Sequence, residues 1–276
     1  MAISAQDVKK LRDMTGSGMM DCKKALAEAD GDFDKAIEVL RKRGEKVAAK
    51  RDDREAKEGV IIAQVTEAND YGIVVRLSSE TDFVAKNDDF VAFAQKIADL
   101  ALDKRPTDLD ALNALPMEGQ LTVGEKVTEM VGKINEKISV TAYEQLSAPL
   151  VAPYIHSGYR AGVLVALNKN DDTAYEAGRD VAMQVAAMKP IAVNKSGIDQ
   201  ATIDQELDIA MDLARQEGKP EAMLEKIGQG RLNKFFKENT LEAQAFVKSD
   251  KQSVAQYLDS VDKGLKVTDF KHVALG

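Results

Sequence analysis

Apolar residues in the first 45 positions recur at the three-to-four-residue spacing of amphipathic helices. This spacing predicts three helices, over Ser4 to Thr15, Ser17 to Glu28 and Asp32 to Arg43, and the first opens with a Ser-x-x-Asp cap. Gly44 is expected to end the third helix. Because their apolar positions converge on one small core, residues 1–46 are expected to form a three-helix module.

A basic segment follows, with eight Lys or Arg and four acidic residues between Arg41 and Lys57. It holds few large apolar residues, so it is expected to be a solvated linker or a helix extension. Residues 47–58 are therefore assigned as a basic linker. The net charge of +4 over residues 41–57 leaves a local RNA contact open as an alternative.

From Gly59 the apolar period changes to two. The run GVIIAQVTEANDYGIVVRLSS predicts a β-hairpin whose turn lies near Asn69 and Asp70, and a helix is expected from Asp88 to Leu102. Further along, Thr122 to Ile134 has a helical pattern and Lys137 to Gln145 an extended one.

A similar hairpin and helix occur again later in the chain. AGVLVALN (161–168) echoes YGIVVRLS (71–78), and RDVAMQVAAMKP (179–190) echoes DFVAFAQKIADL (89–100). The repetition predicts an internal duplication. Because neither copy alone covers both faces of its sheet, the two are expected to pack into an α+β core.

Two helical runs follow Pro190, from Gln200 to Gln216 and from Pro220 to Asn239, with a Gly-Lys-Pro turn between them. They predict an antiparallel helical hairpin that protrudes from the core. Strands are expected afterwards over Gln244 to Lys248 and Val267 to Val273, so the hairpin would be an insertion in the second repeat. The predicted domains are a core N-subdomain (59–140), a core C-subdomain (141–190 with 241–276) and the hairpin (191–240).

Composition narrows the function. With 38 basic and 46 acidic residues the formal net charge is -8, which disfavours sequence-independent nucleic acid binding by the whole surface. The one cysteine, Cys22, excludes an internal disulfide framework, fits a reducing compartment and is expected to be buried. No signal-peptide core and no run of about 18 apolar residues is found, so a cytoplasmic location is expected.

The sequence lacks the motifs of common enzyme classes. The Gly-Lys pairs at 132–133 and 218–219 are followed by Ile and Pro, so neither is a P-loop. Two histidines and one distant cysteine do not make a zinc site, and no nucleophile elbow occurs. The adjacent acids Asp88 and Asp89 are interpreted as a helix cap. We therefore expect a binding protein without catalytic residues, metal or cofactor.

The segment SSETDFVAKNDDF (78–90) places Asp82 and Phe83 side by side where a strand leads into a helix. In such a loop one residue commonly caps the helix and the other packs inward. The alternative is that the aromatic ring is an exposed anchor for a partner protein. Local pattern alone leaves both interpretations open.

Longer motifs carry a resemblance to a known family. TDFVAKNDDF (81–90), with TGSGMMDCKKAL (15–26) in the helical module, resembles bacterial elongation factor Ts. The similarity continues through YIHSGYRAGVLVAL (154–167), VAMQVAAMKP (181–190) and GRLNKFFKENTLEAQAFV (230–247). The family resemblance implies a guanine nucleotide exchange factor that binds the GTPase elongation factor Tu and expels GDP, rather than an enzyme.

The resemblance also implies roles for particular residues. Phe83 would wedge into the partner and Asp82 would disturb its magnesium and phosphate site, with the flanking Thr81 and Val84 in the same motif. In the YxHxG segment, His156 and Gly158 would contact the partner. Met19 and Met20 would lie on the docking module, whose fold would resemble a ubiquitin-associated domain. In some lineages of the family the helical hairpin self-associates, so the resemblance leaves self-association of this chain open.

Simpler interpretations stand beside these. His156 can equally close a strand end through a hydrogen bond, and at most one of Met19 and Met20 is expected in the module core. An RNA-associated accessory protein that uses residues 41–57 is the second hypothesis for function, and an enzyme dependent on Asp88 or Asp89 is the third. The chain ends soon after VTDFKHVALG, where some relatives carry a further helix, which leaves the contacts of that helix in doubt.

Overall fold

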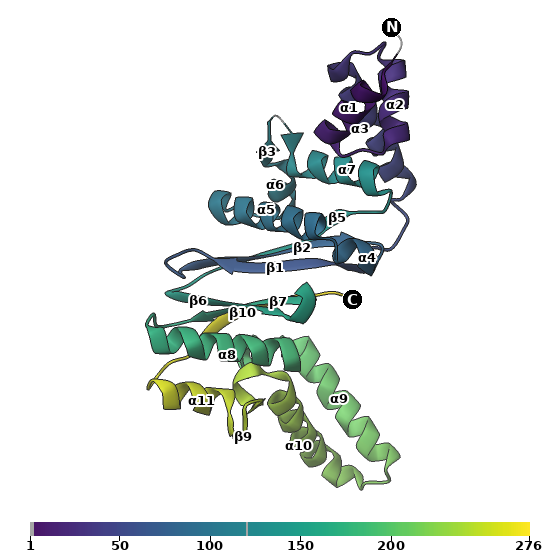
Figure 1. The fold of residues 1–276 in the computed structure, drawn as a ribbon. Coiled ribbons are helices and arrows are strands. Elements are labelled where there is room, and N and C mark those ends of the chain that lie inside the picture. The colour runs from purple at the N-terminus through teal and green to yellow at the C-terminus, as the bar shows by residue number, and fades with distance from the viewer. Residues whose placement is uncertain (1–2, 120) are drawn as a thin grey trace.

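A computed structural model describes residues 3–119 and 121–276, and it shows a mixed α+β protein (Figure 1). Three N-terminal helices share a small core in which Leu11, Cys22 and Leu26 are fully buried. The Ser4 hydroxyl accepts a hydrogen bond from the Asp7 amide at 3.1 Å, which confirms the predicted cap. These helices are α1 (Ala5–Thr15), α2 (Met19–Glu28) and α3 (Phe33–Lys50).

The prediction that Gly44 ends the third helix is wrong, because α3 continues to Lys50. Gly44 lies where α3 crosses α7 (Val123–Ile134), and a Cβ atom on Gly132 would come within 2.9 Å of the Gly44 Cα atom. The glycine therefore permits close helix packing instead of a left-handed cap. The expected linker over 47–58 likewise begins inside a helix, since Val47 and Ala48 pack against the core.

The first sheet has the order β1-β2-β5 with antiparallel neighbours. Asn69, with φ 54°, lies in the turn between β1 and β2, as predicted. Helices α5 and α7 cover one face of this sheet, and Phe90 and Ile97 of α5 are buried there. Its elements are β1 (Glu58–Val65), β2 (Tyr71–Ser79), α5 (Asp88–Lys104), α6 (Leu109–Ala114), a small ribbon of β3 (Pro116–Glu118) and β4 (Leu121–Thr122), and β5 (Ser139–Ser147).

The second sheet has the order β10-β7-β6, and α8 and α11 contribute to the core on its outer face. The strand predicted over Gln244 to Lys248 shortens to β8 (Ala245–Phe246), which pairs with an unpredicted strand, β9 (Ser249–Ser253). The other elements are β6 (Leu150–His156), β7 (Ala161–Leu167), α8 (Asp172–Met188), α11 (Val254–Val261) and β10 (Val267–Ala274).

The two sheets pack face to face, which gives a helix–sheet–sheet–helix arrangement (Figure 1). Ile61 and Val74 of the first sheet meet Leu164 of the second in a shared apolar layer. A Cβ atom on Gly162 would lie 2.7 Å from the Ile61 side chain, so the glycine allows close approach. Because β5 pairs with β2, the expected subdomain boundary at 140/141 falls inside a strand and is corrected to follow β5.

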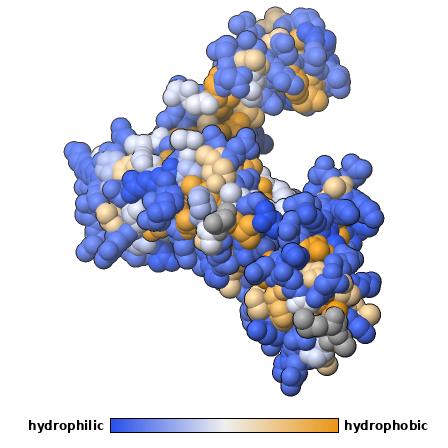
Figure 2. Space-filling model, turned by 90° about the horizontal axis from the view of Figure 1, so that it is seen from above, coloured by the Kyte–Doolittle hydropathy of each residue, from blue (hydrophilic) through white to orange (hydrophobic). Residues whose placement is uncertain are grey.

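The helical hairpin is confirmed as α9 (Gln200–Gln216) and α10 (Glu221–Asn239), which project together beyond α8 (Figure 1). Gly228 of α10 lies against Leu207 and Met211 of α9, and Gly218, with φ 76°, forms the turn between the helices. Figure 2 shows a mostly hydrophilic surface on which apolar residues form separate small patches. No helix in the described residues is long and apolar enough to span a lipid bilayer.

Candidate functional site

The one-turn helix α4 (Asp82–Ala85) joins β2 to α5 and presents Phe83 to solvent. The Phe83 side chain is 84 % exposed, whereas Val84, the next residue, packs against the core of the first sheet. The interpretation in which the aromatic ring packs inward is therefore wrong for Phe83. An exposed ring on a short ordered turn is the geometry of an interface anchor.

Asp82 lies beside this ring and keeps its carboxylate accessible. Its side chain is 45 % exposed and forms an ion pair with Lys86 at 2.6 Å. The hydrogen bond and charge of Lys86 lower the pKa of the Asp82 carboxyl, so it stays ionised at neutral pH. An exposed ion pair of this kind is weak, so the Asp82 carboxylate can exchange Lys86 for another cation at little cost in free energy.

Glu80 anchors the turn to two other parts of the chain. Its carboxylate is 14 % exposed and pairs with Arg51 at 2.7 Å and Arg54 at 2.9 Å. It also accepts a hydrogen bond from the Lys137 amide at 2.5 Å. Burial alone would raise the pKa of Glu80, but these hydrogen bonds outweigh it and lower the pKa to about 2.

This lowered pKa predicts how stability depends on pH. Glu80 stabilises the fold fully above its unfolded pKa of about 4.5, and the contribution is lost as the pH falls from there towards 2. We expect Glu80→Gln to lower the unfolding free energy by about 1–3 kcal/mol at pH 7 and by much less at pH 2.5. Urea unfolding at both pH values measures this. Glu55→Gln, which alters an exposed pair with Lys57, is the charge-matched control, and an equal Glu80→Gln penalty at both pH values would contradict the prediction.

His156 and Gly158 lie in the turn between β6 and β7. The exposed His156 ring accepts or donates a hydrogen bond at 3.2 Å with the Tyr154 hydroxyl, so the strand-end interaction is present. Gly158 has φ 69°, which a tight turn requires here. Arg160 pairs with Glu58 at 3.4 Å, and Glu58 lies opposite Ser79 at the end of β2. The turn and α4 therefore occupy the same end of the stacked sheets (Figure 1).

Met19 and Met20 lie on the N-terminal module, apart from α4. Their exposed fractions are 44 % and 64 %, so neither enters the module core. This agrees with the expectation that at most one of them would do so. Met14, 56 % exposed, is a further apolar residue on this module. The structure thus brings the α4 turn and the His156 turn to one end of the sheets, while the methionines belong to a separate surface.

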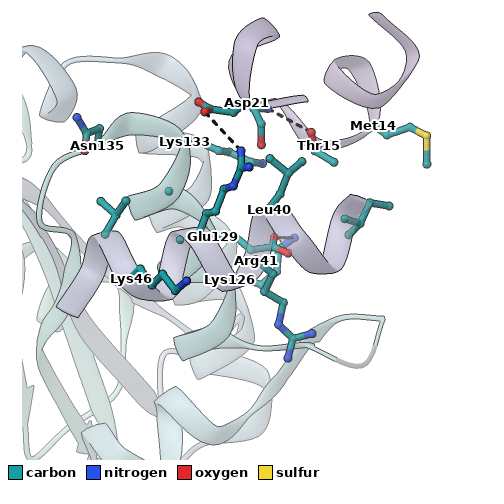
Figure 3. Close-up of a pocket in the computed structure, with 16 residues that line it drawn as sticks. Met14, Thr15, Asp21, Leu40, Arg41, Lys46, Lys126, Glu129, Lys133 and Asn135 are labelled. Atoms are coloured by element: carbon teal, nitrogen blue, oxygen red, sulfur yellow. Dashed lines mark hydrogen bonds and ion pairs between the residues drawn. The ribbon is translucent and has the colours of Figure 1, made fainter. Parts of the chain in front are cut away.

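A cleft of about 590 Å³ is lined by residues of the three N-terminal helices and of α7 (Figure 3). Met14 lines it from α1, Asp21 from α2, Leu40 and Arg43 from α3, and Lys133 from α7. These residues lie far apart in the sequence, so local pattern could not predict the cleft. Within residues 3–119 and 121–276, no cluster of three or more His, Cys, Asp or Glu side chains is placed to hold a metal ion.

Comparison with known proteins adds independent information. A family model described as Elongation factor TS matches residues 80–276. The chain is 56 % identical over 278 residues to elongation factor Ts of Amoebophilus asiaticus (strain 5a2), which covers 100 % of both chains. It is 54 % identical over 274 residues to elongation factor Ts of Christiangramia forsetii, with 99 % of each covered. A relative from Alkalilimnicola ehrlichii is 46 % identical over all of this chain and 93 % of its own length.

Proposed function

The chain belongs to the elongation factor Ts family, and from this premise we propose that its α4 turn is the element that opens the nucleotide site of elongation factor Tu. As a member of the family, the protein is a nucleotide exchange factor in translation elongation, it acts in the cytoplasm, and it is not an enzyme. The observation that supports the role of α4 is the 84 % exposed Phe83 ring on a turn tied to the core through Glu80.

Exchange requires coupling between two binding events. The factor must bind empty or distorted GTPase better than the GDP-bound form, and nucleotide must weaken the factor to the same degree. Acceleration by about four decades requires roughly 5.5 kcal/mol of differential stabilisation. Truncation of a buried aromatic anchor costs about 2–4 kcal/mol, so Phe83 supplies a large share and other contacts the rest.

For Asp82 we propose that the carboxylate disturbs the magnesium and phosphate region of the partner. Asp82→Asn is expected to slow GDP release about tenfold, or ~1.4 kcal/mol, at millimolar magnesium, because it removes the charge that acts on the metal. When magnesium is chelated, the difference should vanish. Fluorescent GDP release measured under both conditions is the test.

Lys86→Met is the matched control, because it removes the ion-pair partner of Asp82 but leaves the carboxylate. This variant should exchange at close to the wild-type rate. If Asp82→Asn is equally slow with and without magnesium, the carboxylate does not act through the metal.

The remaining contacts belong to the same proposal. The exposed His156 and Gly158 would bind beside the α4 turn, and Met19 and Met20 would form an adaptable apolar contact on the module. Within the motif, Thr81 would cap the start of the α4 turn, and Val84 would pack the turn against the core. No cofactor or metal of the protein's own enters this scheme.

For the architecture, we propose a duplicated hairpin-and-helix core, because β2 and β7 are each the central strand of a three-stranded sheet. The α9–α10 hairpin would be an insertion in the second copy, and residues 1–46 a docking module that resembles a ubiquitin-associated domain. The exposed Ile209, Leu213 and Met223 support self-association through the hairpin.

The RNA hypothesis loses support in the structure. Four arginines of the basic segment are paired with acids: Arg41 with Glu125, Arg43 with Glu28, and Arg51 and Arg54 with Glu80. These cations already have partners within the chain, so phosphate would have to displace them.

A further inference from the structure

The α4 turn is too short to hold its own shape. It has four residues, and isolated helices shorter than about 12–15 residues are marginal in water. Its direction must therefore be fixed by contacts with the rest of the protein. Val84 packs against the core from within the turn, and Thr81 provides the contacts at its start.

Thr81 is held by one carboxylate, that of Glu136. The Thr81 hydroxyl donates to one oxygen of Glu136 at 2.7 Å, and the Thr81 backbone amide donates to the other at 3.1 Å. The hydroxyl has one hydrogen, so donation to Glu136 leaves its lone pairs for the Val84 amide, 3.5 Å away, which begins the helical turn.

Glu136 is well placed for this contact. It follows Asn135, which ends α7 with φ 61°, and precedes the buried Ile138. The last pair between β2 and β5 is Ser78 opposite Ser139. Continued by two and three residues, this antiparallel register places Glu80 opposite Lys137 and Thr81 opposite Glu136.

Hydrogen bonds from side chains thus continue the register of β2 and β5 beyond their last paired residues. Glu80 binds the Lys137 amide, and Glu136 binds Thr81, so two adjacent residues after α7 hold the two residues before α4. Neither contact uses Phe83 itself. Both hold residues directly before α4, the turn that carries Phe83.

We infer that Glu136 is a positioning residue for nucleotide exchange, which fixes the direction in which Phe83 leaves the molecule. This inference rests on the proposed role of Phe83. Without the Glu136 carboxylate, the Thr81 amide and hydroxyl form hydrogen bonds with water instead, and the Phe83 ring samples several directions. Only one of these directions is productive, so the ring must be ordered when the nucleotide site opens. The free-energy cost of this ordering slows the exchange step.

Glu136→Ala is expected to slow GDP release from elongation factor Tu at saturating factor by about five- to tenfold, while its affinity for the GTPase changes by less than about twofold. Stopped-flow release of fluorescent GDP measures the rate, and its concentration dependence gives the affinity. Glu144→Ala on β5 is the matched control, since Glu144 is 46 % exposed and its ion pair with Lys271 is long, at 4.0 Å. It should behave as wild type.

Variants at Thr81 separate positioning from a general loss of structure. Thr81→Val removes the hydroxyl that donates to Glu136 but keeps the backbone amide, so it should slow GDP release in the same direction as Glu136→Ala. The double variant Glu136→Ala/Thr81→Val should be slowed by less than the product of the two single effects, because both changes remove the bond between the Thr81 hydroxyl and the Glu136 carboxylate. If Glu136→Ala lowers the melting temperature, Glu136→Gln serves instead: it keeps the volume and one acceptor, for the Thr81 hydroxyl, but its NH2 group cannot accept from the Thr81 amide, so GDP release should still be slower than with wild type.

A Phe83→Ala background distinguishes this inference from the proposed function. In that background Glu136→Ala should cause no further loss of exchange. If Phe83→Ala alone exchanges normally, the proposed role of Phe83 fails. If Phe83→Ala is slow but a folded Glu136→Ala variant exchanges at the wild-type rate, or slows the Phe83→Ala protein as much as the wild type, the positioning role is overturned.

Discussion

Phe83→Ala is expected to slow release of fluorescent GDP from elongation factor Tu at least tenfold, or ~1.4 kcal/mol, at saturating factor. The physical reason is that, on the role proposed for α4, the ring, 84 % exposed in the free protein, would become buried against the partner in the complex. Its removal therefore takes away an interaction that favours the nucleotide-free partner.

The same exposure predicts that this variant keeps its fold. The melting temperature and the circular dichroism spectrum should change little, because substitutions at exposed sites usually alter stability by less than about 0.5 kcal/mol. Phe90, fully buried in α5, is the contrasting aromatic, and Phe90→Ala should destabilise the protein by about 3–5 kcal/mol. A Phe83→Ala protein that unfolds would show that the ring is structural.

The second large effect is expected on partner binding, when the N-terminal module is removed. Deletion of residues 1–46 should weaken binding to elongation factor Tu by about tenfold or more, or ~1.4 kcal/mol, while the exchange rate at saturation changes much less. The reason is that the module has its own core and carries Met19 and Met20, whereas Phe83 lies at the end of the first sheet. Binding and exchange measured over a concentration series separate the two quantities.

Because this deletion cuts α3 and uncovers Gly132 on α7, a second variant is needed. Met19→Ser/Met20→Ser keeps the module and alters two exposed side chains. It should lose affinity in the same direction as the deletion. Equal affinity with and without the module, and with both methionines replaced, would contradict the docking role.

Local sequence pattern predicted much of the fold. The Ser4 cap, the hairpin turn at Asn69 and the two helices around Gly218 depend on residues close together in the chain, and all three are present. Gly44 was misinterpreted because a glycine after a helical run commonly ends the helix. The residue that requires it, Gly132, lies in another helix and cannot be found from periodicity.

The candidate site shows the same division. The Thr-Asp-Phe-Val motif was recognisable, but pattern alone could not decide whether Phe83 faces inward or outward, because a four-residue helix has no measurable period. The contacts that hold the turn, from Glu80 to Lys137 and from Thr81 to Glu136, join residues 57 and 55 positions apart. Such side-chain contacts depend on the register between β2 and β5, which only the folded structure provides.

The most direct test of this account compares the plateau rates of GDP release from elongation factor Tu as wild-type protein and its Phe83→Ala variant are each raised to saturation. We predict that wild-type protein greatly accelerates release and that the variant reaches a plateau at least tenfold lower, in keeping with the loss of a buried aromatic anchor. Equal plateaus for the two proteins would contradict the account, because the outward ring would then contribute nothing to opening the nucleotide site.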